Sequence, residues 1–526
     1  MIVDKLREEN YKLKFELKMT TVKFNNLSLE NARLKRDINA KTTKEIIKLE
    51  NEYKSNINNL NKIIDDKDKE IDALKAEIAK MYSIMNNNSS NSGIPTSKTK
   101  IGEKKYIPNS REKSNKTIGG QKGHKKHKLY AFSDEDANEI IEVTPEKCPN
   151  CNSDDFIVTD NSKDKCQTDY TVKVIKKKYK FKECICNKCN NKFHVNIPNE
   201  LKEENQYGNA VKSMCLCLTN EINTPFNKTV KLIRGITNDE INLSEGYVAK
   251  LQKQGSEKLE NFINELKEYF PKQYCYGWDD GVITVGSKDA VLRTYCTDKI
   301  ALFIAHEKKN KEGIKEDGIL SNTSSYSIVM HDHILHNYNK MYSFDNVECI
   351  IHLIRRLKKS KENTNHNWQE KLKELLSEYN KKRNNLIEKG IEEFKCDELD
   401  KLDKKFDNIL KEGKEINIRD EKNYFKEEEK NFIEDIIKYK ENYLKWCYDF
   451  KLPSTNNNSE RNIRPVKSKL KISGQFQNIN YAKYYATIRS YIETCKRFDK
   501  NIIEACNKLL EGKPYTLKEL LNEKND

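Results

Sequence analysis

The chain has 526 residues, which is too long for a single hydrophobic core and predicts three or four folded units. Charged residues make up 34% of it, the mean hydropathy is −0.90, and the absence of any run of about 18 apolar residues excludes a membrane-spanning helix. The formal net charge of +15 favours a polyanionic partner such as nucleic acid, although an AT-rich genome would also produce such lysine usage.

The start of the chain is charged throughout and does not resemble a secretory signal. The chain contains 15 cysteines, and without a signal these indicate a reducing compartment, where paired cysteines more often bind metal than form disulfides. We therefore expect a cytoplasmic protein.

Residues 1–82 contain almost no helix breakers and predict a coiled coil that resembles a leucine zipper. Two heptad registers are visible, and the phase slips between them, so the rod is either interrupted or folds back as a hairpin. Asn10 and Asn31 occupy core positions of the first register, where a buried amide fixes the alignment of the helices. The function that this segment suggests is self-association into a homo-oligomer, and the alternative is a lone charged helix.

A flexible linker is predicted for residues 83–118, on the evidence of the stretch NNNSSNSG. The glycine-rich and basic stretch GGQKGHKKHKL then opens a unit that spans residues 119–200. Its side chains could neutralise DNA phosphates, whereas an ordinary solvated loop would have a similar composition. The candidate DNA-binding residues in it are Lys122, His124, Lys125 and Lys126.

Two CxxC pairs in the same unit predict a zinc-binding ribbon. Cys148 and Cys151 form the first pair, and Cys186 and Cys189 form the second. Each pair can bend into a knuckle that directs two thiolates at one tetrahedral Zn²⁺, although the spacer between the pairs is longer than usual. The β-like stretch YTVKVIKKKYKF lies between them. The alternative is that these are free buried cysteines. Cys184 and His194 are spare candidate ligands, and we expect them to be bystanders.

Residues 201–272 read as helices and form a possible DNA-binding unit. From residue 273 the pattern changes to three β-rich segments, a short helix and a fourth apolar strand. This order fits a ribonuclease-H-like α/β sheet, in which the first and fourth strands are neighbours. The fold class expected for the whole chain is therefore multidomain α+β, with a coiled coil, a zinc ribbon, a helical region and a ribonuclease-H-like catalytic core interrupted by a helical insertion.

Two aspartates are placed to meet in that sheet. Asp279 stands at the predicted end of the first strand, and Asp332 stands just past the fourth. Two neighbouring carboxylates repel each other unless a cation lies between them, and oxygen ligands alone suit Mg²⁺ or Mn²⁺. An acid at a strand end is, however, usually a solvated cap, so these residues are weak evidence by themselves.

A third acid is expected in the stretch LPSTNNNSERNIRPVKSKLKISGQF. Here Glu460 begins a helix, and Lys467 lies about two helical turns further on, on the same face. A carboxylate for metal and a lysine for a DNA phosphate form a plausible pair.

In the order of its motifs, the chain resembles the insertion-sequence-66 family of bacterial DDE transposases over nearly its whole length. The likeness includes the zipper-like start, the NNNSSNSG linker, the GGQKGH block, the CxxC pairs and the acidic strand end. It also includes a VHDH-like stretch, a CxxHxxR box from Cys349 to Arg355, and the most specific element, NNxSERxxRPVK.

The resemblance implies that Asp279, Asp332 and Glu460 are the catalytic residues and hold two Mg²⁺ or Mn²⁺ ions. It further implies that Cys349 and His352 support the site from beside it, with a core role for His352 as the alternative. Family members commonly carry Asp-Glu-Thr at the first acid, whereas this chain has Asp279, Asp280 and Gly281. Both aspartates are therefore candidates for the first ligand, and Asp279 is preferred.

The core is expected to comprise residues 273–358 and 453–526, separated by a charged helical insertion at residues 359–452. The implied function is cleavage and strand transfer of insertion-element DNA ends in a bacterial cytoplasm, associated with the nucleoid. Arg461, Arg464 and Lys467 would contact phosphates of double-stranded DNA, namely the terminal inverted repeats and the target, with accessory proteins of the element as possible partners. The alternatives are an inactive zinc and coiled-coil DNA-binding protein and a metal-dependent nuclease that does not join strands.

Overall fold

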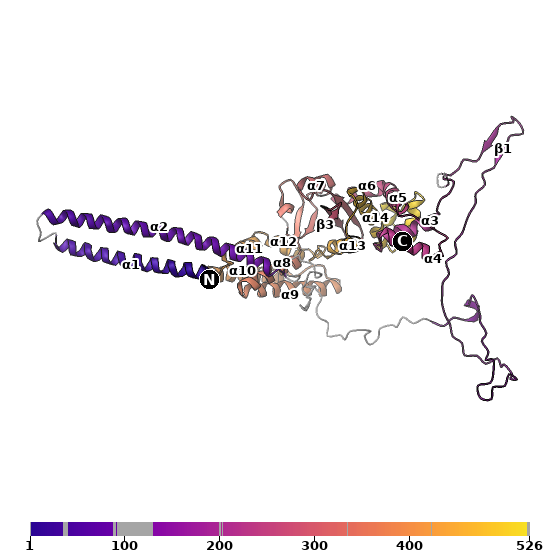
Figure 1. Cartoon of the computed structure of the whole chain (residues 1–526), viewed down its shortest axis with the longest axis horizontal. Coiled ribbons are helices and arrows are strands. Elements are labelled where there is room, and N and C mark those ends of the chain that lie inside the picture. The colour runs from indigo at the N-terminus through magenta and orange to yellow at the C-terminus, as the bar shows by residue number, and fades with distance from the viewer. Residues whose placement is uncertain are drawn as a thin grey trace.

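The computed structural model of the chain describes residues 2–34, 40–87, 91, 130–198, 201, 203–333, 335–421 and 423–522. A helical hairpin projects from one end of a mixed α+β body, and an arm that carries a small two-stranded sheet projects from the other (Figure 1). The GGQKGH block, and with it Lys122, His124, Lys125 and Lys126, lies outside the described residues, as does most of the predicted linker.

The N-terminal hairpin consists of α1 (Ile2–Leu34) and α2 (Ala40–Met85), which lie side by side (Figure 1). Asn10 Nδ2 donates a hydrogen bond to Asp68 Oδ1 over 2.9 Å, and Asn31 Nδ2 donates one to Glu50 Oε1 over 2.6 Å. From the first pair to the second, the residue number rises in α1 and falls in α2, so the two helices are antiparallel. Of the two arrangements that the phase slip allowed, the chain adopts the one that folds back on itself.

The arm at residues 130–198 contains the antiparallel strands β1 (Glu183–Ile185) and β2 (Lys192–His194). The prediction of β-structure for residues 170–181 was wrong, because this stretch forms no strand in the structure. Its side chains are almost all exposed, and its backbone has no partner strand to complete a ladder of hydrogen bonds. An alternating sequence is thus not sufficient for a strand when no neighbouring surface buries one of its faces.

Four helices precede the main sheet: α3 (Asn209–Asn220), α4 (Phe226–Ile236), α5 (Glu245–Glu257) and α6 (Glu260–Tyr269). The helix α5 begins at Ser244, whose hydroxyl accepts a hydrogen bond from the backbone N–H of Tyr247 over 3.1 Å and so caps the first turn. The apolar faces of these helices pack with the sheet and the C-terminal helices into one hydrophobic core, which contains buried residues such as Leu216, Leu251 and Leu266.

The main sheet has five strands in the order β5-β4-β3-β6-β7. In chain order these are β3 (Cys275–Val285), β4 (Lys288–Cys296), β5 (Ala301–His306), β6 (Ile328–His331) and β7 (Asp345–Glu348), with the short helix α7 (Lys311–Asp317) before β6. The strands β3, β4 and β5 form an antiparallel meander, whereas β6 pairs in parallel with both β3 and β7. The first and fourth strands are therefore neighbours, as the sequence predicts.

Between β7 and the last part of the body the chain forms α8 (Ile350–Thr364), α9 (Trp368–Glu388), α10 (Cys396–Arg419), α11 (Lys426–Lys438) and α12 (Lys440–Tyr448). These helices share a hydrophobic core of their own, in which Trp368, Phe406 and Trp446 are completely buried. The helical region thus packs largely around itself, and it begins at Ile350, nearer to the sheet than the residue range expected for the insertion.

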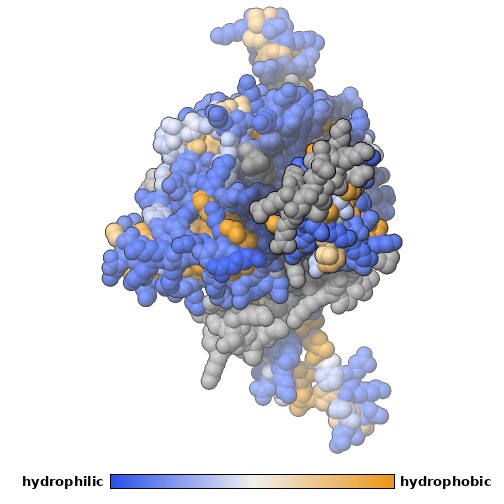
Figure 2. Space-filling model, turned by 90° about the vertical axis from the view of Figure 1, so that its left-hand side faces the viewer, coloured by the Kyte–Doolittle hydropathy of each residue, from blue (hydrophilic) through white to orange (hydrophobic). Residues whose placement is uncertain are grey.

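The chain then returns to the sheet. The helix α13 (Asn457–Ser473) crosses β3 and β4, α14 (Ile479–Arg497) packs on β5, and α15 (Ile502–Leu510) and α16 (Leu517–Asn522) complete the body. None of the described helices is both long enough and apolar enough to cross a membrane. The face seen along the axis of the hairpin is mainly hydrophilic, with hydrophobic residues in small separate groups (Figure 2).

Candidate active site

The register of the parallel strands places the two aspartates. The pairing of β3 with β6 runs from Cys275 opposite Ile328 to Gly277 opposite Met330. Asp279 stands two residues after Gly277 in β3, and Asp332 stands two residues after Met330, directly past the end of β6. The same register therefore brings the two aspartates to adjacent positions. The prediction that Asp279 ends its strand was wrong. Asp279 lies in the interior of β3, which pairs with β4 as far as Val285.

The helix α13 lies on β3 at unusually close range. A Cβ atom added to Gly277 would lie 2.6 Å from Ser459 Oγ, and one added to Gly281 would lie 3.0 Å from Ile463 Cγ2. Gly277, Asp279 and Gly281 alternate along the strand and therefore share the face that α13 covers. The two glycines thus make room for the helix, and Asp279 stands between them.

Asn456, immediately before α13, fixes the start of the helix to both neighbouring elements. Its Nδ2 donates a hydrogen bond to the carbonyl oxygen of Trp278 over 2.8 Å, and its backbone N–H donates one to Cys349 Sγ over 3.2 Å. Glu460 follows in the first turn of the helix and is consequently held near Asp279.

The electrostatics of the site reflect the crowding of acids. Burial, followed by the negative charges of Asp332 and Glu460, raises the pKa of Asp279 to about 8. Burial also raises the pKa of Asp332, with Asp280 and Glu348 adding to the effect and His352 and His331 opposing it. In addition, Glu460 Oε1 is buried without a hydrogen-bond partner. A bound cation would stabilise the charged form of each of these groups.

Asp280 lies on the opposite face of β3 from Asp279, because side chains alternate along a strand. Its Oδ1 forms an ion pair with Lys309 Nζ over 3.0 Å, so its charge is already balanced within the chain. Of the two candidates for the first acid, Asp279 is therefore the one on the face that α13 and Glu460 cover.

Cys349 and His352 adjoin the acids from the side of α8. Cys349 precedes the helix and is completely buried, and His352 stands in the first turn, with Nε2 lying 3.9 Å from Glu460 Oε1. Burial alone would lower the pKa of His352, but a hydrogen bond with Cys349 and the charges of Asp332 and Glu460 raise it to about 9. Within the described residues, Cys349, His352 and Glu460 are the one group of three potential metal ligands whose ligand atoms all lie within 4.8 Å of one another.

The basic residues predicted to contact DNA lie along α13. Arg461, Arg464 and Lys467 are all exposed, and the side chain of Lys467 reaches back toward β3, with Cε lying 4.0 Å from a Cβ added to Gly281. Lys469, by contrast, is buried and donates a hydrogen bond to the carbonyl oxygen of Thr219 over 3.2 Å. The three exposed cations therefore lie along α13, and Lys467 is the one that approaches β3.

Sequence reasoning missed a buried polar network behind Asp332. Glu348, at the end of β7, is completely buried, and its Oε1 lies 2.8 Å from His333 Nδ1. His333 Nε2 in turn lies 3.1 Å from an Oδ2 atom of Asp435 that also accepts a hydrogen bond from Arg356 over 2.6 Å. Burial alone would raise the pKa of Glu348, but the contacts with His333 bring it below its ordinary value. The signal available in the sequence was an acid directly before the CxxHxxR box.

The network ties the loop after β6 to the helical region, since Asp435 belongs to α11 and Arg356 to α8. Burial opposes protonation of His333, but its hydrogen bonds with Asp435 and Glu348 raise its pKa to about 9. The loop that carries Asp332 is thus supported from outside the sheet.

The two CxxC pairs form matching turns in the arm. The backbone N–H of Asn152 donates to the carbonyl of Cys148, and that of Asn190 donates to the carbonyl of Cys186, each over 2.8 Å. Hydrogen bonds from the backbone of the following residues lower the pKa of both Cys148 and Cys186. The structure does not gather the two turns at one point, because no group of three close ligands among the described residues includes Cys148, Cys151, Cys186 or Cys189.

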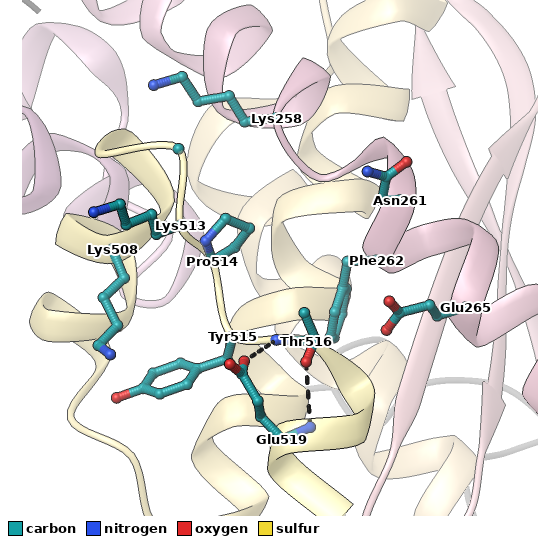
Figure 3. Close-up of a pocket in the computed structure, with 11 residues that line it drawn as sticks. Lys258, Asn261, Phe262, Glu265, Lys508, Lys513, Pro514, Tyr515, Thr516 and Glu519 are labelled. Atoms are coloured by element: carbon teal, nitrogen blue, oxygen red, sulfur yellow. Dashed lines mark hydrogen bonds between the residues drawn. The ribbon is translucent and has the colours of Figure 1, made fainter.

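A cavity of about 560 Å³ lies away from the acids, between α6 and the C-terminal helices (Figure 3). Thr516 and Glu519 on its wall satisfy each other: the backbone N–H of Thr516 donates to Glu519 Oε2 over 2.8 Å, and that of Glu519 donates to Thr516 Oγ1 over 3.2 Å. This is the reciprocal pattern of a helix cap, so these polar groups have a structural role in starting α16.

Comparison with known proteins gives one family. The protein-family model described as "Transposase IS66 family" matches residues 205–484, which is just over half of the chain. The matched range includes the helices α3 to α13, the sheet and all three acids, and it ends within the second turn of α14. No curated protein matches the chain.

Proposed function

The chain belongs to the IS66 family of transposases, and on this premise we propose that it is a DDE transposase that cuts the ends of an insertion element and joins them to target DNA. Asp279, Asp332 and Glu460 are the catalytic carboxylates in this proposal. The sheet and α13 would then be a ribonuclease-H-like core, a fold in which neighbouring parallel strands and a later helix bring acids from distant parts of the chain together.

One observation carries the proposal: three acids from β3, the end of β6 and α13 influence one another in a largely buried place. The register of β3 with β6 and the close contact of α13 with β3 support this proximity, and the pKa of Asp279, which burial and then the charges of Asp332 and Glu460 raise to about 8, agrees with it. Uncompensated negative charges are costly to bury, and a protein that maintains such an arrangement usually uses it to bind cations.

The family implies that divalent metal ions take part, and the residues present fit them. The donors are carboxylates, which suit Mg²⁺ or Mn²⁺, and the buried Glu460 Oε1 has no hydrogen-bond partner. When bound, two such ions supply activation of the attacking hydroxyl and stabilisation of the leaving oxygen in phosphoryl transfer. The three acids would hold the ions, and the buried network of Glu348 and His333 would keep the loop of Asp332 in place.

The chain itself would position the DNA. Lys467, Arg461 and Arg464 are exposed along α13, where they can neutralise phosphates next to the scissile bond. His352 would hold Glu460 by charge, since its Nε2 lies 3.9 Å from Glu460 Oε1. Catalysis would then depend on orientation and charge neutralisation, without a covalent intermediate on the protein.

The remaining units would recognise the element ends and assemble the complex. We assign DNA recognition to the basic GGQKGH block and to a zinc ribbon made by the two CxxC turns, each of which already directs backbone N–H groups at a thiol. The α1–α2 hairpin would act as a coiled coil that joins copies of the chain, so that two element ends are held together.

The proposal is tested with DNA that carries the inverted repeats flanking the gene. Incubation of the full chain with this DNA and Mg²⁺ should give strand cleavage at the ends and, with a target DNA, joined products. Binding without cleavage would favour the inactive DNA-binding protein, and cleavage without joining would favour the nuclease.

A further inference from the structure

The ligand atoms of Cys349, His352 and Glu460 lie within 4.8 Å of one another, at a place where the start of α8 meets the start of α13. From this geometry we infer that the three residues form a second metal site, for a borderline-soft divalent ion such as Zn²⁺, which shares Glu460 with the proposed Mg²⁺ site. Zn²⁺ bound there would hold Glu460 away from the aspartates and inhibit the enzyme. Only this last consequence rests on the proposed function.

The donor set selects the ion. A thiolate, an imidazole and one carboxylate are typical ligands of Zn²⁺, which binds four-coordinate sites of mixed sulfur, nitrogen and oxygen. Mg²⁺ prefers oxygen ligands and retains its water, so it would not compete for Cys349 and His352. Three protein ligands leave a fourth position for water. The shared carboxylate thus faces a hard-ion site on one side and a softer site on the other.

Two polar atoms at this place lack a hydrogen-bond partner within the described part of the chain, although Glu460 Oε1 lies 3.9 Å from His352 Nε2 in an ion pair. Glu460 Oε1 and His352 Nδ1 are both buried without a hydrogen-bond partner among the described residues. Burying such atoms without a hydrogen-bond partner destabilises the fold, and a bound ion would offset that cost. Cys349 Sγ accepts the backbone N–H of Asn456 over 3.2 Å, so the sulfur is held at the start of α13.

The charges around the site favour a cation. Arg355 is the nearest opposing group, with NH1 lying 3.4 Å from His352 Nε2. Glu460 itself and the carboxylates of Asp279 and Asp332 stand against the positive charges of Arg355 and of protonated His352, and a bound metal ion would replace the proton of His352. The site is also assembled before any ion binds, because Cys349 and His352 are neighbours on one turn and Asn456 fixes α13 to Cys349.

The test uses Co²⁺, which replaces Zn²⁺ and gives an intense charge-transfer absorption when a thiolate binds it. The full chain is first loaded with Zn²⁺ at its tightest sites, and Co²⁺ is then titrated into the full chain, into Cys349→Ser and into the matched control Cys447→Ser. Cys447 is equally buried but lies in the core of the helical region, remote from the acids. We expect the control to retain the thiolate–cobalt band of the full chain and Cys349→Ser to lose one equivalent of it.

Glu460→Gln provides a second variant that keeps both Cys349 and His352. Loss of the charged ligand should weaken Co²⁺ binding at this site by at least about tenfold. Equal cobalt spectra for the full chain, Cys349→Ser and Glu460→Gln would overturn the site, whether or not the chain cleaves DNA.

The inhibitory consequence is measured separately. Micromolar Zn²⁺ added to the full chain at a fixed Mg²⁺ concentration should slow cleavage of element-end DNA, and a chelator should restore it. If the cobalt band depends on Cys349 but Zn²⁺ leaves cleavage unchanged, the site stands and its effect on Glu460 is refuted. If the chain does not cleave DNA at all, the proposed function fails, while the cobalt result still decides the metal site.

Discussion

A Cβ atom on Gly277 would lie 2.6 Å from the hydroxyl oxygen of Ser459, so α13 approaches β3 more closely than any side chain larger than glycine allows. This contact sets the distance between the helix that carries Glu460 and the strand that carries Asp279. The first prediction tests it.

Gly277→Ala should displace the start of α13, since the same Cβ would also lie 2.7 Å from Asn456 Oδ1. Overpacking of this kind typically costs about 1–3 kcal/mol, and the shift of Glu460 should reduce DNA cleavage much more than DNA binding. The control is Gly235→Ala in α4, where an added Cβ meets nothing within 4 Å and alanine favours the helix by up to about 1 kcal/mol. Thermal unfolding and cleavage rates measured on both variants decide the matter, and equal behaviour would contradict the prediction.

Asp279→Asn should lower the cleavage rate by about a thousandfold or more, because it removes a charge that the proposed metal ions need. Asp280→Asn is the matched control: the neighbouring carboxylate lies on the other face of β3 and pairs with Lys309. Single-turnover cleavage of end DNA with each variant is the measurement. If Asp280→Asn were the inactive one, the assignment of the first acid would have to be exchanged.

The contribution of Asp279 to the stability of the metal-free chain should fall as pH rises from 3.8 to about 8. These are the ordinary and the folded-state pKa values of Asp279, and in this interval the folded state binds the proton more tightly than the unfolded state does. Melting temperatures recorded across this range should show the decline, and Mg²⁺ should reverse it at the upper end. In Asp279→Asn the decline should be smaller, and an unchanged profile in that variant would refute the explanation.

Arg461→Ala, Arg464→Ala and Lys467→Ala should each weaken DNA binding and reduce the salt dependence of the binding constant by about one ion. The effect should not depend on DNA sequence, because these side chains would contact phosphates. Lys513→Ala is a suitable control, since this exposed lysine lies on the wall of the cavity beside α16. The measurement is the slope of the logarithm of the binding constant against the logarithm of the salt concentration. The same slope for all four variants would argue against α13 as a DNA-binding surface.

A Zn²⁺ ion should draw together the two CxxC turns of the arm, which the structure does not gather at one point, and bind to Cys148, Cys151, Cys186 and Cys189. The backbone hydrogen bonds that lower the pKa of Cys148 and Cys186 favour the thiolate form that binds the ion. Replacement of Cys148 or Cys186 by serine should remove this zinc and weaken recognition of the element ends. X-ray absorption of the Cys349→Ser chain, which lacks the thiolate of the inferred second site, with one equivalent of Zn²⁺ would show a sulfur-only zinc environment, and the absence of stoichiometric metal would exclude the ribbon.

Much of the sheet could be predicted because its signals are local. Apolar alternation and short polar joints identify the strands, and the order of strands and helix predicts that the first and fourth are neighbours. The length of β3 was misjudged because Gly281 looks like a break. The strand in fact continues to a turn at Gly286 and Ser287, both with positive φ, and pairs with β4 throughout.

The position of Glu460 could not be derived from local physics. Its helix follows a separately packed helical region, and no local pattern states that the chain returns to β3; only the resemblance to a family supplied that step. The one sign in the sequence of the contact between β3 and α13 is the alternation of Gly277, Asp279 and Gly281. The strand β7 was missed because it is short and half polar, and the partners of Glu348 are too distant along the chain to be inferred.

The long return of the chain to β3 has a consequence for biosynthesis. The ribosome synthesises both aspartates and the whole helical region before it reaches Glu460. Only then can α13 pack against Gly277 and Gly281 of β3. Domains of a nascent chain fold as they emerge, so the early units can take shape while the acid trio is still incomplete. If the proposed function holds, a polypeptide still attached to the ribosome, or truncated before α13, would accordingly lack DNA-cleaving activity.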